Sequence, residues 1–484
     1  MLKRKQSLYS IFRLGNKVQM RNLIFALLVI PLIASGCSYT AAPADLLQKP
    51  AIAADKEKLS ASIMKALPNY SVLMVPEQDD YKEAIRLIDL DNDGTEEAVV
   101  TYYNEYSTPE IMVMKQSEDG WRQSVVIEQS LARDIAWFKL IDLDKDGKTE
   151  FLTGWIGGFD SPNVLEVYSY KSKAVRNEKG RWTLPPARSL PYYLVDVGEI
   201  DGDNLTDIAV VTEIGSSGEI AIPTYYLSVY TWSNNDMKKQ LKLQLPEGVN
   251  SFERMLIGSI SERHQGIVLE GNTGAHSMLT YMYAWENNNL SLVYPDRSLG
   301  HEGFSGKPTM SEDINNDGII ELQWVREAPG YSDISYAETT WINEWIQWDG
   351  EKQFVKVAEQ YLEYTYGVKV NIPESWRDRY TMRKPPDSSY GIVTFEYWNA
   401  EQKISADLAT IYVVPVKQWK AVESVWHEEQ RPYRALASDS GNMYVVSFEK
   451  EAPTELPDKW KADFEDMLKV ESEFPSYFEI EHEE

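Results

Sequence analysis

The sequence is short of the two residue types that most often carry redox and transition-metal chemistry. Among its 484 residues there are one cysteine and five histidines, scattered along the chain: Cys37, His264, His276, His301, His427 and His482. A single cysteine excludes an internal disulfide, and the spacing contains no HExxH motif and no cysteine-based zinc pattern. The chain also lacks a P-loop. These absences argue against zinc hydrolases and P-loop nucleotidases.

Nucleophile motifs are missing as well. The segments GFSGK (303–307) and GSSG (215–218) do not have the G-x-S-x-G spacing of a nucleophile elbow. His301, Glu302 and Ser305 lie close in sequence, but a catalytic triad is defined by spatial geometry. No catalytic residue is predicted, although a carbohydrate-active enzyme could carry its acids on loops without fixed spacing.

Positive charge is the third shortage. The chain has 48 Lys and Arg against 75 Asp and Glu, a formal net charge of −27 at pH 7. This balance argues against nucleic acid or an anionic lipid surface as a partner, because phosphate binding needs clustered basic residues, and it favours cations. Aromatic residues are plentiful, with 15 Trp and 29 Tyr. They suit packing in β-sheets first, and a protein-binding or sugar-binding surface second.

Long apolar runs are also absent, apart from LIFALLVIPLIA (23–34), which is interrupted by Pro31. A run of about a dozen residues is short for a membrane span, which needs about 20. Before it the chain has no acids and six basic residues, namely Lys3, Arg4, Lys5, Arg13, Lys17 and Arg21. Ser35-Gly36-Cys37 follows it, so the segment has the layout of a secretory signal with small residues before the cleavage site.

The segment IASGC (33–37) resembles the lipobox of a bacterial lipoprotein signal, with Ala34 where Leu is commoner. The resemblance implies that residues 1–36 are a signal peptide and that Cys37 becomes the diacylglyceryl-modified N-terminus. An ordinary signal or a buried free thiol is the alternative reading of Cys37. Met20 is an alternative start, because MRNLIFALLV opens a complete signal. We expect a bacterial protein that is secreted and lipid-anchored to the outer face of the cytoplasmic membrane.

Loss of residues 1–36 would leave 42 Lys and Arg against 75 Asp and Glu, a net charge near −33. The segment SYTAAPADLLQKPAIAADKEK (38–58) is small and polar and has no strong hydrophobic period. We expect it to act as a tether, and residues 37–79 to form a tether and N-terminal segment.

What the sequence does have is a repeated acidic motif, D-x-D-x-D-G-x-x-E, between runs of β-branched or aromatic residues. It occurs as DLDNDGTEE (89–97), DLDKDGKTE (142–150), EIDGDNLTD (199–207) and DINNDGIIE (313–321). The first three copies start 53 and 57 residues apart, and the last starts 114 residues after the third. A degenerate copy falls midway in that gap, at LIGSISERHQGIVLEG (256–271), where Gly258, Ile260 and Gly266 occupy three of the four ligand positions.

This spacing suits a hard cation. Ca²⁺ takes six to eight oxygen ligands at about 2.3–2.6 Å, and alternate residues of a tightly coiled loop turn their side chains towards one centre. Position 7 can offer its backbone carbonyl, and Gly or Asn at position 6 permits positive φ. The predicted ligands at positions 1, 3, 5, 7 and 9 are Asp89, Asp91, Asp93, Thr95 and Glu97; Asp142, Asp144, Asp146, Lys148 and Glu150; Glu199, Asp201, Asp203, Leu205 and Asp207; and Asp313, Asn315, Asp317, Ile319 and Glu321.

Other readings of the motif fit less well. An EF-hand needs a bidentate Glu at position 12 and flanking helices, whereas position 12 is Val100, Thr153, Val210 or Trp324 and the flanks are strand-like. The EF-hand and the similar dockerin readings therefore fail. Merely solvated turns would have to hold three or four carboxylates within nine residues, four times, without a counter-ion. Calcium at up to four sites is the favoured interpretation.

Each repeat reads as four antiparallel strands. In the first they are EAIRLIDL (83–90), EEAVVTYY (96–103), PEIMVMKQ (109–116) and WRQSVVIEQ (121–129). The third strand recurs as VLEVYSYKS, YYLSVYTWSNND, LTYMYAWENNN and TTWINEWIQWDG, each running into a hairpin-type turn. Four antiparallel strands in a repeat of this length predict the blade of a β-propeller.

The acidic loops and their strands resemble the FG-GAP and VCBS repeats, the calcium-loop blades of integrin α-chain propellers and of many secreted bacterial proteins. The resemblance covers residues 80–364 and implies Ca²⁺ bound at positions 1, 3, 5 and 9. Glu instead of Asp at position 9 in three loops departs from the family and puts affinity and denticity in doubt. Propellers of this family often have seven blades, whereas five are counted here; the alternative is that residues 50–80 supply part of another blade.

The acidic repeat stops after residue 364. The segments YGVKVNIPESWRDRY, GIVTFEYWN, LATIYVVPV and GNMYVVSFEK read as strands, and Gln418–His427 and Asp458–Glu471 read as helices. This order predicts a small α+β domain over 365–484, with Trp376 as a core residue. The phrase VNIPESW and the order of elements resemble the PsbP-type sandwich domain.

Taken together, the chain is expected to be mainly β, with about five four-stranded blades over 80–364 and a small α+β sandwich after them. The favoured function is a lipid-anchored, calcium-binding module or scaffold for an extracellular protein or glycan, without nucleic acid. The alternative is an enzyme on a propeller scaffold that acts on cell-wall or other polysaccharides. Activity on a glycan, as opposed to binding alone, would distinguish the two.

Overall fold

A computed structural model describes residues 54–78, 81–118, 120–158, 161–215, 223–274, 276–296, 302–331, 334–385 and 390–481. The predicted signal peptide and Cys37 lie outside these ranges. The first element is the helix α3 (Ala54–Ala66). It includes the last five residues of the predicted tether, which are therefore helical. No helix in the described ranges has the length and hydropathy needed to cross a membrane.

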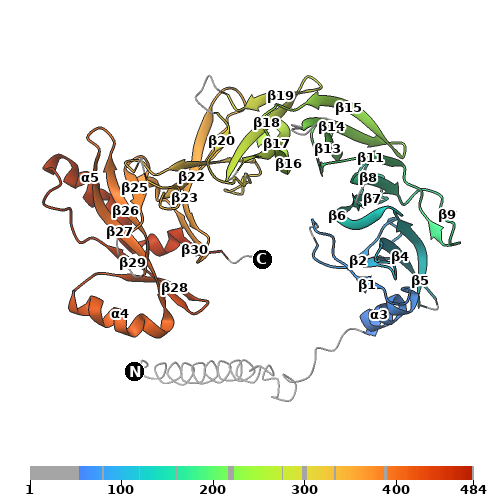
Figure 1. Cartoon of the computed structure of the whole chain (residues 1–484), viewed down its shortest axis with the longest axis horizontal. Coiled ribbons are helices and arrows are strands. Elements are labelled where there is room, and N and C mark those ends of the chain that lie inside the picture. The colour runs from blue at the N-terminus through green and yellow to red at the C-terminus, as the bar shows by residue number, and fades with distance from the viewer. Residues whose placement is uncertain are drawn as a thin grey trace, which may run out of the picture. The chain divides into compact units, whose positions relative to one another are not determined.

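The first sheet contains the four strands predicted for the first repeat (Figure 1). They are hydrogen-bonded in chain order, and β1 adds to the far end of β3. The strands are β1 (Val72–Leu73), β2 (Ile85–Ile88), β3 (Glu97–Tyr103), β4 (Pro109–Ser117) and β5 (Gly120–Glu128). β3 and the start of β4 are buried on both faces, which explains their nearly continuous apolar sequence.

The next three sheets repeat this order. The second contains β6 (Ala132–Ile141), β7 (Glu150–Gly157), β8 (Val164–Ser169) and β11 (Arg188–Pro191). A two-stranded hairpin, β9 (Val175–Arg176) and β10 (Trp182–Thr183), interrupts it. The third contains β12 (Leu194–Gly198), β13 (Asp207–Ile214), β14 (Thr224–Ser233) and β15 (Asp236–Gln244). The fourth contains β16 (Ser251–Ser261), β17 (His264–Gly274), β18 (Ser277–Glu286) and β19 (Asn289–Tyr294), with β20 (Phe304–Ser305) on β18.

The fifth sheet combines strands from both sides of the predicted division at 364/365. Its order is β21 (Leu322–Glu327), β22 (Trp341–Trp348), β23 (Phe354–Glu363), β24 (Val368–Asn371) and β30 (Phe478–Ile480). The strand before the acidic loop is reduced to a single bridge between Glu312 and Glu321. Because β24 and β30 complete this sheet, the last repeat and the C-terminal region share main-chain hydrogen bonds.

Hydrophobic clusters join each sheet to the next along the chain. Ile111 and Trp155 belong to the cluster between the first and second sheets, and Leu227 and Ile267 to the one between the third and fourth. Further clusters join the second to the third sheet and the fourth to the fifth. None of the clusters formed by described residues joins the first sheet to the fifth.

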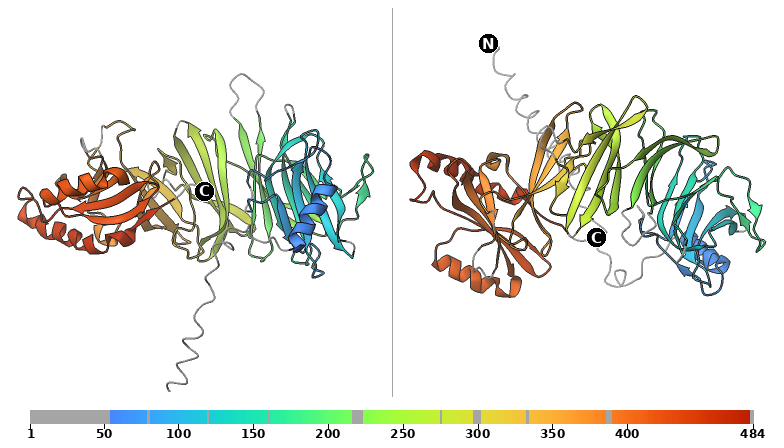
Figure 2. Two further views of the ribbon diagram at one scale, coloured as in Figure 1. Left: turned by 90° about the horizontal axis from the view of Figure 1, so that it is seen from below. Right: turned by 45° about the horizontal axis from the view of Figure 1, so that its top comes forward.

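The C-terminal region has a five-stranded sheet between two helices (Figure 2). Its strands are β25 (Tyr380–Arg383), β26 (Gly391–Asn399), β27 (Ile404–Pro415), β28 (Arg434–Asp439) and β29 (Asn442–Phe448). The helix α4 (Val416–Glu428) packs Trp426 on Tyr412 of β27. The helix α5 (Asp458–Leu468) buries Phe464 in the hydrophobic cluster that also contains Ile411, the neighbour of Tyr412, so the helices cover opposite faces.

The predicted core role of Trp376 is confirmed. Its ring is fully buried, and its Nε1 donates to the carbonyl oxygen of Met467, 3.0 Å away. The predicted amphipathic face of the last helix is observed at Trp460, Phe464 and Met467, which are buried in the same cluster. The helix ends at Leu468, however, and a 3-10 turn (Lys469–Ser472) takes the place of its predicted end. The α+β prediction for this region therefore agrees with its local structure.

Candidate metal-binding loops

The four acidic loops share one hydrogen bond that fixes their ninth residue. In each loop the carboxylate at position 9 accepts a bond from the backbone N–H at position 2, which closes the loop on itself. The pairs are Leu90 to Glu97 (2.9 Å), Leu143 to Glu150 (3.3 Å), Ile200 to Asp207 (3.0 Å) and Ile314 to Glu321 (3.0 Å). The ninth residue thus points into the loop in every copy, as a ligand at that position must.

The first and fifth residues shape the turn. In three loops the Asp at position 1 accepts backbone N–H bonds from positions 5 and 6, at 2.8 to 3.1 Å. In the third loop the longer Glu199 accepts from Gly202, at position 4, instead. The Asp at position 5 accepts from the seventh residue, which is Thr95, Lys148, Leu205 or Ile319. That carbonyl oxygens at position 7 act as ligands stays a prediction.

Backbone geometry confirms the expected positive φ at position 6 and adds a second position. Gly94, Gly147, Asn204 and Gly318 have φ between 63° and 87°. Position 4 is also left-handed, at Asn92, Lys145, Gly202 and Asn316, with φ between 55° and 85°. Asn and Gly tolerate this conformation well. Positive φ at position 4 was not predicted because no ligand is expected at this position, although three of its four residues are Asn or Gly.

Side-chain oxygens of the predicted ligands are brought together in three loops, although not every predicted ligand joins its group. Oxygen atoms within 4.8 Å of one another come from Asp89, Asp91 and Glu97; from Asp142, Asp144 and Asp146; and from Glu199, Asp201 and Asp203. In the last loop, the Asn315 amide lies 3.1 Å from Asp317 and 3.3 Å from Glu321. Asp93, Glu150 and Asp207 are outside the three groups of oxygens.

Several of these carboxylates are buried without enough positive charge. Burial raises the pKa of Glu150, Asp207 and Glu321 to about 7, and nearby Asp side chains add to the effect. One oxygen each of Asp91, Asp144 and Asp207 is buried without a hydrogen-bond partner. Unpaired buried oxygens are costly, and a divalent cation coordinated by them would relieve the cost. The donor set, all oxygen and mostly anionic, fits Ca²⁺.

Protein side chains reach into three of the loops. In the first, Lys115 Nζ lies 2.9 Å from Asp91 Oδ2 and 3.3 Å from Glu97 Oε1. In the second, Lys171 pairs with Asp146. In the last, Gln347 Nε2 donates to Asp317 (2.8 Å) and Glu321 (2.7 Å). These residues lie on or just after the third strand, at least 18 residues from their loops, and were not predicted from the motif.

Main-chain hydrogen bonds also connect successive loops. The N–H at position 8 donates to the carbonyl at position 2 of the preceding repeat: Thr149 to Leu90 (3.0 Å), Thr206 to Leu143 (3.3 Å) and Ile320 to Ser259 (2.8 Å). Ser259 belongs to the degenerate copy. The spacing between neighbouring loops is therefore kept even where one of them has lost its acids.

The degenerate copy has become a tight hairpin, consistent with the predicted loss of its ligands. β16 and β17 pair up to Ser261 and His264, which leaves only Glu262 and Arg263 in the turn. Ile260, at position 3, is fully buried, and a Cβ at Gly266, position 9, would lie 2.6 Å from Ile260 Cδ1. An apolar contact thus occupies positions 3 and 9, which carry Asp, Asn or Glu side chains in the other loops.

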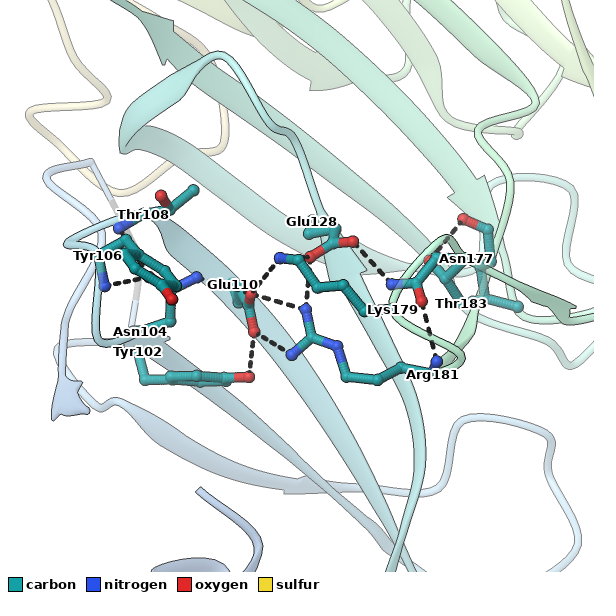
Figure 3. A network of polar contacts seen from close by, with 11 residues as sticks. Tyr102, Asn104, Tyr106, Thr108, Glu110, Glu128, Asn177, Lys179, Arg181 and Thr183 are labelled. Carbon is teal, nitrogen blue, oxygen red and sulfur yellow. Dashed lines mark hydrogen bonds and ion pairs between the residues drawn. The ribbon is translucent and has the colours of Figure 1, made fainter. Parts of the chain in front are cut away.

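A separate buried charge cluster ties the β9–β10 hairpin to the first sheet (Figure 3). Glu110 is 1% exposed and accepts two bonds from Arg181, at 2.7 and 2.8 Å, and one from Asn104, at 2.8 Å. Tyr102 also donates to Glu110, at 2.5 Å, and Arg181 also pairs with Glu128. Sequence reasoning missed this cluster because Glu110 and Arg181 are 71 residues apart.

No protein-family model matches the chain. No curated protein matches it either. Among solved structures, the chain is similar to a rhamnogalacturonan lyase of Bacillus licheniformis, with TM-score 0.27 and 9% identity, over 69% of this chain and 84% of that one. An exotype rhamnogalacturonan lyase gives TM-score 0.26 and 11% identity over 63% and 73%. A putative 6-phosphogluconolactonase from Bacteroides uniformis gives 0.28 and 9% over 70% and 94%.

Proposed function

We propose that this protein is a calcium-binding module of the FG-GAP/VCBS type, lipid-anchored outside the bacterial cell, that presents its repeats to an extracellular protein or glycan. The observation that carries the proposal is the common geometry of the four acidic loops. In each, a buried carboxylate is turned inward by the same backbone N–H bond. Buried oxygens without partners, found in three of the loops, support a cation as the missing partner.

The proposal further assigns the five sheets to propeller blades. This assignment is supported by the repeated order of four strands and by the hydrophobic clusters that join each sheet to the next. A binding role is favoured over catalysis because the carboxylates of the four loops accept backbone hydrogen bonds within those loops. The lipid anchor at Cys37 and the secreted location rest on the sequence alone.

Calcium binding can be measured directly. Isothermal titration of the metal-free protein, expressed without residues 1–36, is expected to show between three and four calcium ions per chain. A variant with Asp142→Asn and Asp144→Asn is expected to bind one fewer. The matched control, Asp236→Asn with Asp439→Asn, removes the same charge at two hairpin turns and is expected to leave the number unchanged. Absence of calcium binding at millimolar concentrations would overturn the proposal.

The partner proposal has its own test. Immobilised protein is exposed to a glycan array and to extracellular extract, with calcium or with EGTA. Specific retention that requires calcium and is lost in the double Asp→Asn variant supports a binding module. Release of a shortened glycan product would support the enzyme instead.

A further inference from the structure

The loops differ in a feature that the acidic motif does not contain. In each repeat, the strand register places one residue of the third strand opposite the ninth residue of the loop. Glu150 pairs directly with Ser169. The pair Ala98–Met114 puts Lys115 opposite Glu97, Ile208–Tyr230 puts Thr231 opposite Asp207, and Leu322–Ile346 puts Gln347 opposite Glu321. The series is therefore Lys, Ser, Thr and Gln at one structural position.

The lysine of this series, Lys115, contacts residues of the predicted ligand set. Its ammonium contacts Asp91 and Glu97, two members of the predicted ligand set, and it lies 5.1 Å from the centre of the Tyr170 ring, which belongs to the second repeat. The side chain is still 39% exposed. It can therefore leave for solvent when a divalent ion arrives, but only by giving up two ion pairs.

The second loop contains a similar competitor, and the other two loops do not. Lys171 lies 3.8 Å from Asp144 and also pairs with Asp146. Within the described residues, the third loop forms no ion pair with a basic side chain, and the last is contacted by the neutral amides of Gln347 and Asn315. A resident unit charge opposes a divalent ion over a few ångströms, whereas a neutral donor does so far less.

We propose that Lys115 and Lys171 are built-in cationic competitors that divide the loops into two affinity classes, with the first and second loops binding Ca²⁺ more weakly than the third and last. The inference rests on the proposed calcium function and adds a graded response to it. At low calcium only the loops without lysine are filled. The lysine-containing loops fill when calcium is plentiful.

Glycine amides allow each loop to be followed separately. Gly94, Gly147, Gly202 and Gly318 lie in the four loops, and protein labelled with ¹⁵N-glycine gives one backbone resonance for each. In a titration with calcium alone, the midpoints for Gly202 and Gly318 are expected to be at least about tenfold lower than those for Gly94 and Gly147.

Substitutions test the cause. Lys115→Ser, which installs the residue of the second repeat, is expected to lower the Gly94 midpoint at least about tenfold and to leave the Gly202 midpoint unchanged. Lys115→Gln, which installs the residue of the last repeat, is expected to have the same effect. It replaces the serine variant in the test if that variant folds poorly. Lys242→Ser is the matched control, because it removes the same charge from β15, where Lys242 lies over the Tyr226 ring. The reciprocal change Thr231→Lys is expected to raise the Gly202 midpoint about tenfold.

The outcomes separate the two claims. If no loop glycine shifts at millimolar calcium, the calcium function itself is wrong. If all four shift with one midpoint that neither Lys115→Ser nor Thr231→Lys changes, the calcium function stands and the competitor role of the lysines is overturned.

Discussion

Buried carboxylates occur in two settings in this protein. Burial by itself raises the pKa of each, but at Glu110 the hydrogen bonds from Arg181, Tyr102 and Asn104 outweigh burial and lower the pKa to about 2. At Glu150, Asp207 and Glu321, burial prevails and raises the pKa to about 7. The difference is a resident guanidinium. Under the proposed calcium function, a bound ion would supply the positive charge that these three carboxylates lack.

Removing the guanidinium should turn the first setting into the second. Arg181→Met leaves Glu110 buried beside Tyr102 and Asn104 without its main cation, and breaking a buried pair typically costs about 3–5 kcal/mol. Because Arg181 is 22% exposed and Lys179 lies 3.9 Å from Glu110, we expect the lower end, a loss of about 3 kcal/mol in the free energy of unfolding by urea. Arg176→Met, on the same hairpin, should cost under about 1 kcal/mol. Equal effects of the two variants would contradict the comparison.

Neutralising a loop carboxylate should have opposite effects with and without calcium. Asp207→Asn keeps an acceptor for the Ile200 N–H but removes the charge. In EGTA the variant should be as stable as the native protein or slightly more so, because an unpaired buried charge is gone. In calcium it should lose about 2 kcal/mol relative to the native protein, because a ligand is lost. Urea unfolding of the variant and the native protein in both buffers measures the two stability differences, and Asp236→Asn is the control. A loss of the same size in both buffers would show that Asp207 is only structural.

The Glu110 network should also appear in the pH dependence. The pKa of Glu110 is lowered to about 2 in the folded protein, against about 4.3 in an unfolded chain. The stabilisation that ionised Glu110 gives to the folded protein is therefore fully present above about pH 4.3 and is lost as the pH falls towards 2. The difference in melting temperature between the native protein and Glu110→Gln should shrink over that window. A difference that stays constant from pH 6 to pH 3 would show that the carboxylate charge is not the stabilising feature.

The degenerate repeat provides the smallest and most specific contrast. Ile260→Val removes one buried methylene from the contact with Gly266, and such a change typically costs about 1 kcal/mol. Because this hairpin has no ligand set, the cost should be the same in calcium and in EGTA. A calcium-dependent cost, measured by thermal unfolding in the two buffers, would mean that this hairpin is coupled to metal after all.

Local sequence patterns predicted much of the framework. The alternation of apolar runs and turn residues located β3, β4 and β5 to within one or two residues. The nine-residue motif located the loops, because the turn and its acidic side chains are encoded in adjacent positions. The same holds for the buried face of α5, where Phe464 and Met467 follow the helical period.

Other features depend on residues that are distant in sequence. Arg181 reaches Glu110 from a hairpin inserted between β8 and β11, and no local pattern indicates that meeting. Lys115 and Gln347 enter the loops only through the register of the third strand. The pairing of β24 with β30 joins segments about 110 residues apart. The end of the acidic repeat therefore predicted a division at 364/365, whereas the fifth sheet continues across that point.

Calcium binding by the folded protein can be tested by comparing its melting temperature in excess EGTA with that in millimolar calcium. A ligand that binds only the folded state stabilises it by mass action, by about 2.7 kcal/mol for each site at 100 times its Kd. Several such sites should raise the melting temperature by at least about 5 °C. We expect that rise in calcium and its reversal by EGTA; an unchanged melting temperature in the two buffers would contradict calcium binding by the folded protein.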